Sequence, residues 1–188
     1  MPADVFISAD MKWMDWVDTR HLIQPGSRTT LLGNTLVLVE KRDALKPVTI
    51  AAGLDMNSVL GAQGRLAVGD PASVPAGIYA RQALTKLGLW TTVSARLAPA
   101  ENVRAALLLV ERGEAPAGVV YGSDVKAAPG LAVAGTFPDN SHEPIRYPAA
   151  LTTGAADAPD AEAFLAFLHT AAARDVFRRA GFLPLDGS

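Results

Sequence analysis

The sequence predicts an α/β fold with largely parallel sheets. Short apolar runs rich in Val, Ile and Leu alternate with helical patterns of about 10 to 15 residues, which is typical of that class. The run at 36–39 is apolar without interruption, as in a strand that is buried on both faces. Hydrophobic residues make up 49% of the 188 positions, so the chain can bury a substantial core.

The first elements alternate strand and helix. Residues 4–8 are predicted to form a strand, and residues 13–17 an amphipathic turn of helix. The run at 36–39 is the second strand and residues 65–69 are the third. The third strand leads into a turn at Asp70–Pro71, which precedes a helix.

Two helices follow, each with residues that mark where it begins or ends. The first is predicted over 75–87, with Pro75 at its first position and Gly88 just past its end. A short strand is expected at 93–97, and a second helix at 99–112 that Gly113 ends. Further strands are predicted at 117–121, 131–137 and 145–151, followed by two consecutive helices at 161–173 and 175–180.

The two helix starts, at residues 74–79 and 99–104, could bind one anion together. The first-turn amides and the positive end of the helix dipole attract anions without a basic side chain. Both starts follow strands, and the carboxyl ends of parallel strands share one edge of a sheet. We expect the first turns to carry Ala, Gly, Asn and Val and no Lys or Arg. The alternative is that proline simply begins each helix.

Tyr121 ends an apolar strand and would place a phenol at the same edge. It is followed by Gly122, Ser123 and Asp124. A buried tyrosine hydroxyl needs a hydrogen-bond partner, so the alternative to anion binding is a hydroxyl that bonds to backbone.

Several function classes are disfavoured. The formal net charge is −2, only 19% of residues are charged and no basic run occurs, so no nucleic-acid partner is expected. The chain has no cysteine, which excludes disulfides and thiolate metal sites, and no His-Glu-x-x-His pattern, so no bare metal cation is expected. Ser123 lacks a Gly-x-Ser-x-Gly context, and His21, His142 and His169 have no carboxylate at a recognisable spacing. We therefore predict a protein that is not an enzyme.

Several blocks at consistent spacing closely resemble the periplasmic molybdate-binding proteins of bacterial ABC importers. The resemblance runs from residue 3 to about residue 183. Its blocks are Ala-Asp-Val-Phe-Ile-Ser-Ala-Asp at 3–10, Lys-Trp-Met-Asp at 12–15, Leu-Gly-Asn-Thr-Leu-Val at 32–37, Gly-Asp-Pro at 69–71 with Val-Pro-Ala-Gly-Ile-Tyr-Ala at 74–80, Leu-Ala-Pro-Ala-Glu-Asn-Val-Arg at 97–104 and Val-Val-Tyr-Gly-Ser-Asp at 119–124.

The resemblance implies a two-lobed fold of the periplasmic-binding-protein type (type II). The second lobe would be residues 40–135, with crossover segments near 36–39 and 134–138. The first lobe would combine 1–35 and 139–188, and would lack the N-terminal strand, helix and strand of the family. The strand at 4–8 would then have an unpaired edge.

The family's oxyanion ligands fall on three positions of this chain. Ala76 and Val103 would donate their backbone amides, and Tyr121 its hydroxyl. Two serine ligands of the family have no counterpart, and Ser8 and Ser27 are not substitutes. The resemblance thus implies molybdate or tungstate as ligand and no cofactor. A carboxylate beside the anion would favour a protonated anion such as phosphate, whereas these three groups supply only donors.

The resemblance also implies partners and location. We expect a monomer in the periplasm that delivers the anion to an ABC permease, although the first residues contain no signal peptide. Trp13 and Trp16 could contact the permease, but we predict that they pack into the first-lobe core. The alternatives are a receptor for sulfate or another oxyanion, a cytoplasmic ligand-sensing domain, and a truncated, weak or inactive binder.

Overall fold

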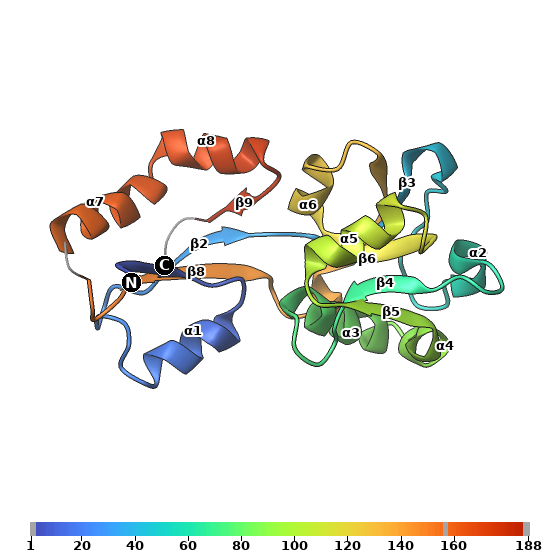
Figure 1. Ribbon diagram of the computed structural model, residues 1–188, viewed down its shortest axis with the longest axis horizontal. Coiled ribbons are helices and arrows are strands. Elements are labelled where there is room, and N and C mark those ends of the chain that lie inside the picture. Colours follow the sequence, from blue (N-terminus) through green and yellow to red (C-terminus); the bar gives the residue numbers. More distant parts are fainter. Residues whose placement is uncertain (1–2, 156–157, 186–188) are drawn as a thin grey trace. The chain divides into compact units, whose positions relative to one another are not determined.

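The chain forms two compact units, each with its own sheet (Figure 1). The computed structural model describes residues 3–155 and 158–185. Unit 1 consists of Met1–Asn34 and Ile145–Ser188, and unit 2 of Thr35–Pro144. The predicted crossover segments near 36–39 and 134–138 lie in unit 2.

The predicted lobe boundaries stay a prediction. Residues 1–2, 156–157 and 186–188 of the predicted first lobe lie outside the described residues. Within each unit, the elements can be compared with the predicted ones directly.

Unit 2 contains a five-stranded sheet in the order β5-β4-β6-β3-β7. Its strands are β3 (Leu36–Lys41), β4 (Leu66–Gly69), β5 (Leu97–Ala100), β6 (Ala117–Tyr121) and β7 (Leu131–Thr136). β4 is parallel to β5 and to β6, whereas β3 is antiparallel to both of its neighbours, β6 and β7. The expected parallel arrangement is therefore right for this sheet except at β3, which runs against the other strands.

Unit 1 contains a four-stranded sheet in the order β1-β8-β2-β9, and every pair in it is antiparallel. The expectation of parallel pairing is wrong here. The sheet pairs strands from opposite ends of the chain, such as Val5 with Leu151, and no helical crossover joins those neighbours directly. Its strands are β1 (Val5–Ile7), β2 (Thr29–Gly33), β8 (Arg146–Leu151) and β9 (Leu183–Pro184).

The remaining elements of unit 1 are three helices, α1 (Met11–Asp18), α7 (Ala158–Leu168) and α8 (Ala171–Arg179). The two consecutive C-terminal helices are confirmed, but the break between them lies near Thr170 and not at residue 174. The Thr170 side chain caps α8 by accepting the Ala173 amide at 3.3 Å. None of the helices in the described part of the chain is long and apolar enough to cross a membrane.

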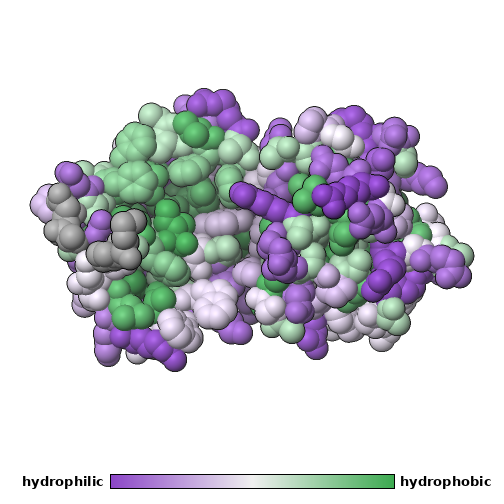
Figure 2. Space-filling model, in the orientation of Figure 1, coloured by the Kyte–Doolittle hydropathy of each residue, from purple (hydrophilic) through white to green (hydrophobic). Residues whose placement is uncertain are grey.

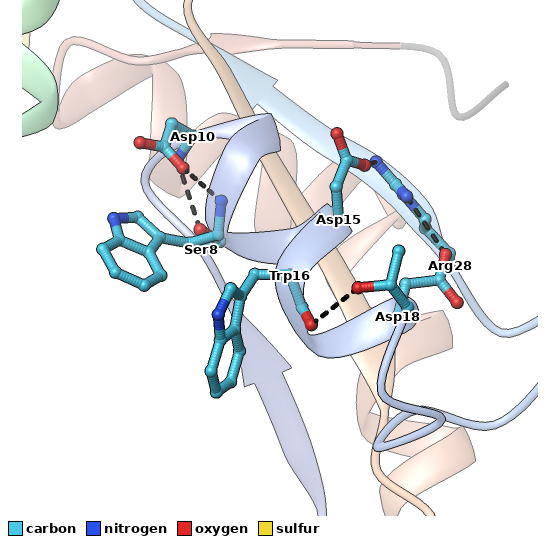
Figure 3. Close-up of polar contacts among 8 residues, drawn as sticks. Ser8, Asp10, Asp15, Trp16, Asp18 and Arg28 are labelled. Carbon is cyan, nitrogen blue, oxygen red and sulfur yellow. Dashed lines mark hydrogen bonds and ion pairs between the residues drawn. The ribbon is translucent and has the colours of Figure 1, made fainter.

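Both tryptophans of α1 are exposed, and Figure 3 shows the Trp16 side chain projecting away from the helix. Trp13 and Trp16 are 47% and 45% exposed, so the prediction that they pack into the core is wrong. Met14 is fully buried and packs with Val17 in their place, because these residues stand one position, or about 100°, further round the helix. The guanidinium of Arg20 lies 3.9 Å from the centroid of the Trp16 ring.

The edge position expected for the first strand is confirmed, since β1 stands at one end of its sheet. Figure 2 shows apolar atoms spread over the surface of unit 1. The large apolar side chains of unit 1 that are exposed are Ile7, Trp13, Trp16, Leu22, Phe164, Phe167, Val176 and Leu183. An unpaired strand edge favours pairing with another strand, and Ile7 is the exposed apolar residue that β1 contributes.

Strand β3 is buried along its apolar length, as predicted. Helix α5 (Val103–Glu111) covers one face of the sheet, where Ala106 and Val110 pack on Val39 and Ala67. The other elements of unit 2 are short: η1 (Arg42–Ala44), α2 (Met56–Leu60), α4 (Trp90–Val93), η2 (Ser94–Arg96), α6 (Gly122–Lys126) and η3 (Asp139–Ser141).

Helix α3 (Pro75–Lys86) agrees closely with its prediction. Gly88 has a φ of +72°, which fits its predicted place just past the helix end. Before the helix, the Asp70 carboxylate accepts the Ala72 amide at 2.9 Å and the Asp70 carbonyl accepts the Val74 amide at 2.9 Å. These bonds turn the chain sharply from β4 into α3.

Two elements differ from the prediction at residues 93–103. The strand expected at 93–97 begins only at Leu97, as β5, while residues 93–96 lie in α4 and η2. Val93 is fully buried there, and tertiary packing overrides its β propensity. The second helix was expected from residue 99, but Pro99 belongs to β5 and the helix begins at Val103. Asn102 sets that start, since its side-chain oxygen accepts the Ala105 amide at 2.8 Å.

Glycine at position 77 allows the first turn of α3 to touch β4. A Cβ on Gly77 would lie 2.0 Å from the carbonyl oxygen of Gly69. Alanine is ordinarily better than glycine inside a helix by about 1 kcal/mol. Here we expect the clash with backbone to outweigh that gain.

We predict that Gly77→Ala lowers the free energy of unfolding by ~2 kcal/mol or more, because neither backbone can yield without moving the helix. Urea unfolding followed by circular dichroism measures the change. The control is Gly130→Ala, where the added Cβ would meet only the Glu111 side chain at 3.9 Å. Equal stability of the two variants would contradict the prediction.

Candidate anion-binding site

The register of unit 2 places three strand ends at one edge of the sheet. Gly69, the last residue of β4, pairs with Ala100, the last residue of β5. Leu66 pairs with Ala117 in the parallel β4 and β6 pair, so β6 ends at the same edge with Tyr121. Helices α3 and α5 begin shortly after β4 and β5. The structure therefore brings the regions of Ala76, Val103 and Tyr121 to one edge.

Ala76 is the second residue of α3 and is 1% exposed. Pro75 precedes it and carries no amide hydrogen, and Val74 at the N-cap provides no side-chain hydrogen bond. The first-turn amides of a helix have no acceptor within the helix itself. Ala76 therefore presents a main-chain donor at the positive end of the α3 dipole.

Val103 is the first residue of α5. The N-cap Asn102 accepts the Ala105 amide with its side chain and the Ala106 amide with its carbonyl. These bonds occupy amides deeper in the first turn and do not use the Val103 amide. Val103 thus resembles Ala76 in offering a main-chain donor at a helix start.

Tyr121 ends β6 and is 6% exposed. Its backbone amide donates to Oδ2 of Asp124 at 3.2 Å, and the next amide, of Gly122, donates to the carbonyl of Thr35 at 2.9 Å. The hydroxyl oxygen is buried. These bonds fix the backbone from which the phenol projects.

The sequence analysis gave no role to two charged residues near this edge, Asp124 and Arg104. Burial raises the pKa of Asp124, while the Tyr121 amide and the positive charge of Arg104 act in the opposite direction. Arg104 is the second residue of α5, so the expectation of no basic residue in the first turns is wrong. The N-cap preference of asparagine at Asn102 is the signal that could have placed the helix start correctly.

Other polar residues that the sequence singled out have local roles. Ser8 accepts the Asp10 amide at 3.3 Å (Figure 3), and Ser27 donates to the Gln24 carbonyl at 2.8 Å. His142 lies beside the ring of Tyr79, with centroids 5.9 Å apart, and His169 contacts Thr29 at 3.1 Å. Within residues 3–155 and 158–185, no three His, Cys, Asp or Glu side chains are placed to hold a metal ion.

A cavity of about 580 Å³ lies at the other end of the same sheet, near the beginning of β6. Glu40, Leu60 and Ala115 are among the residues that line it. None of the three predicted ligand residues contributes to its wall. The candidate site is thus defined by the strand ends and helix starts, and not by this cavity.

Comparison with known proteins shows to which protein family the chain is related. Residues 1–183 match the family described as bacterial extracellular solute-binding protein. The chain is 52% identical over 182 residues to the molybdate-binding protein ModA of Escherichia coli K12, covering 96% of this chain and 70% of that protein.

Solved structures agree with this relationship. The periplasmic molybdate-binding protein of Azotobacter vinelandii superposes with a TM-score of 0.83 at 27% identity, over 99% of this chain and 80% of that one. The sulfate-binding protein SubI of Mycobacterium tuberculosis shares the fold, with a TM-score of 0.79 at 16% identity over 99% and 70% of the two chains. The predicted α/β class of periplasmic-binding-protein type is confirmed. The chain belongs to the bacterial extracellular solute-binding proteins, in the family of the molybdate-binding protein ModA.

Proposed function

We propose that this protein is the solute-binding component of an ABC importer and captures molybdate or tungstate with uncharged donors. The observation that carries the proposal is the convergence of two helix starts and Tyr121 at one edge of the unit 2 sheet. The 52% identity to E. coli ModA supports molybdate as the ligand. Ala76 and Val103 bind through their amides, and Tyr121 through its hydroxyl.

The chemistry of these three groups suits a fully deprotonated oxyanion. Molybdate at neutral pH is a tetrahedral dianion that offers only acceptors, so each oxygen needs a donor. Main-chain amides at a helix start and a phenol supply donors and no competing acceptor charge. A protonated anion such as phosphate needs an acceptor for its hydrogen, which these groups do not supply.

Sulfate is the second candidate ligand. It has the same charge and shape as molybdate, and the fold is shared with the sulfate-binding protein SubI. The two anions differ in size, so the smaller sulfate would make slack hydrogen bonds in a site that fits molybdate. Tungstate is nearly the size of molybdate and binds equally well.

The protein performs no chemistry on its ligand in this proposal. It works as a monomer in the periplasm and hands the anion to a membrane permease. Membership of a solute-binding family supports capture and release as the activity.

Isothermal titration calorimetry with molybdate, tungstate and sulfate tests the function directly. We predict similar affinities for molybdate and tungstate, and binding of sulfate at least ~10-fold weaker, the difference expected from about 1.4 kcal/mol of lost hydrogen bonding. Tighter binding of sulfate would establish the second candidate. No heat with any of the three anions would contradict the proposal.

We predict that Val103→Pro weakens molybdate binding by ~1 to 3 kcal/mol, because proline removes the amide hydrogen but is tolerated at the first position of a helix. Asn102 already has the extended backbone that a residue before proline prefers, with φ −159° and ψ 170°. Calorimetry measures the affinity, and Val103→Ala is the matched control because it keeps the amide.

A second control for the proline is Ala171→Pro, which alters the first position of α8 in unit 1 in the same way. We expect both controls to bind as the wild type does. Unchanged affinity in Val103→Pro would remove this amide from the ligands.

We predict that Tyr121→Phe weakens molybdate binding by ~1 to 3 kcal/mol, the usual cost of losing a hydrogen bond to a charged group. The ring keeps its packing, so thermal unfolding should change little. Tyr147→Phe is the control, since that phenol accepts from Asn34 at 2.9 Å within unit 1. If Tyr121→Phe binds as tightly as the wild type, the hydroxyl is not a ligand.

A further inference from the structure

The cavity of about 580 Å³ at the other end of the unit 2 sheet has one buried charged side chain in its wall. This is Glu40 of β3, which is 4% exposed. The other charged residues of the wall are the half-buried Lys41 and the exposed Lys46 and Glu114. Solvent screens charges at exposed positions strongly, whereas a buried charge is screened much less. The Glu40 carboxylate therefore dominates the potential inside the cavity.

Two observations place this carboxylate at the cavity wall. Val39 packs in the core beneath α5, and side chains alternate along a strand, so Glu40 points away from that core. Oε2 of Glu40 accepts the backbone amide of Lys46 at 2.8 Å, and Lys46 lines the same cavity. This hydrogen bond holds the carboxylate in one orientation.

The second oxygen of Glu40 has acceptor capacity left. Among the described residues no group donates a hydrogen bond to Oε1, and this atom is not sealed from solvent. In the same part of the chain no Lys, Arg or His nitrogen lies within 4 Å of the carboxylate. Buried carboxylates are ordinarily paired with a cation. The cation that Glu40 lacks within the protein can come from a ligand.

Another part of the wall is fixed by Arg96. Its Nε donates to the carbonyl of Gly64 at 3.0 Å, and its Nη1 donates to the side chain of Asn57 at 2.8 Å. A Cβ on Gly64 would lie 1.9 Å from the carbonyl oxygen of Leu60, so the chain there lies tightly against the end of α2. Gly64 and Leu60 both line the cavity. A wall that is already ordered lowers the entropic cost of binding.

We propose that this cavity is a second ligand site, which binds a small aliphatic ammonium ion. The ammonium donates to Oε1 of Glu40, and the alkyl chain lies against apolar residues of the wall such as Leu60 and Ala115. An ammonium fits better than a guanidinium, because a bidentate pair needs both oxygens and the Lys46 amide already bonds to Oε2.

A bare metal ion fits this cavity less well. Calcium takes six to eight oxygen ligands, and no three His, Cys, Asp or Glu side chains are grouped to hold a metal within residues 3–155 and 158–185. The apolar part of the wall would also face an ion with no alkyl chain to cover it. An organic cation uses both the carboxylate and the apolar residues.

The ammonium site is separate from the candidate anion site. β6 begins beside the cavity at Ala117 and ends at the other edge of the sheet with Tyr121, so its length of ~13 Å separates the two. All residues that line the cavity belong to unit 2. The inference therefore does not depend on which anion the other edge binds.

The test titrates the protein with n-butylammonium and follows the amide NMR signal of Lys46, because this amide bonds to Glu40. We expect a saturable shift at millimolar concentrations. Butanol has a similar size and no charge, and butyrate has the opposite charge. Both should bind at least ~10-fold more weakly, because neither offers the carboxylate a charged donor.

Glu40→Gln is the decisive variant. It keeps an oxygen that can accept the Lys46 amide but removes the charge, so we expect n-butylammonium to bind at least ~10-fold more weakly. The matched control is Glu114→Gln, which removes an exposed carboxylate from the wall of the same cavity. Since an exposed charge contributes little, its affinity should stay within ~2-fold of the wild type.

Ala44→Phe tests the cavity without altering Glu40. Ala44 lines the cavity and is exposed, so a phenyl ring there can occupy the space of the alkyl chain without disturbing the core. We expect the saturable shift of the Lys46 amide to be lost. Circular dichroism melting shows whether each variant is folded, and Ala44→Phe decides the matter if Glu40→Gln does not fold.

Four results would overturn the inference. The first is an absence of any saturable shift in the wild type, and the second is equal binding of butanol. The third is unchanged affinity for n-butylammonium in folded Glu40→Gln or in Ala44→Phe. The fourth is a larger loss in Glu114→Gln than in Glu40→Gln, because the ammonium would then bind at the rim of the cavity.

Discussion

The parallel pairing of β4 with β5 and β6 is the constraint on which the candidate site depends. Because Gly69 lies opposite Ala100, the chain leaves both strands at the same height and must begin its next helix there. The same pairing brings the end of β6 to that edge. The close approach of Gly77 to Gly69 then holds the start of α3 against the sheet. Strand pairing thus brings the regions of Ala76, Val103 and Tyr121, which are far apart in sequence, to one edge of the sheet.

Much of unit 2 could be predicted because the residues that begin and end its elements are visible in the local sequence. Pro75 and Gly88 mark both ends of α3, and the uninterrupted apolar run of β3 indicates its burial. The start of α5 was predicted too early because Pro99 resembles a first helical residue. The hydrogen bond from the Ala105 amide to the Asn102 side chain shows instead that Asn102 is the N-cap. Because the helix begins at Val103 and not at residue 99, Arg104 lies in its first turn.

Unit 1 was harder to predict because its order depends on pairing between distant parts of the chain. No local pattern indicates that Val5 lies opposite Leu151, and so the antiparallel sheet was not foreseen. The prediction that the tryptophans of α1 are buried was wrong for a related reason. Two large apolar residues three positions apart look like a buried stripe, but Met14 and Val17 occupy that stripe. The residues alone pointed to the two helix starts and to Tyr121. The choice of Ala76 and Val103 within those starts came from the family resemblance, because a main-chain donor leaves no mark in the side chain.

The distribution of the three tryptophans has an optical consequence. Trp13 and Trp16 stand in solvent on unit 1, whereas Trp90 of unit 2 is partly covered, with the Arg81 guanidinium 5.5 Å from its ring centroid. A neutral quencher such as acrylamide will reach the two indoles of unit 1 first. The emission that survives quenching therefore belongs mainly to unit 2, and its loss during denaturation reports the melting of that unit separately from its neighbour.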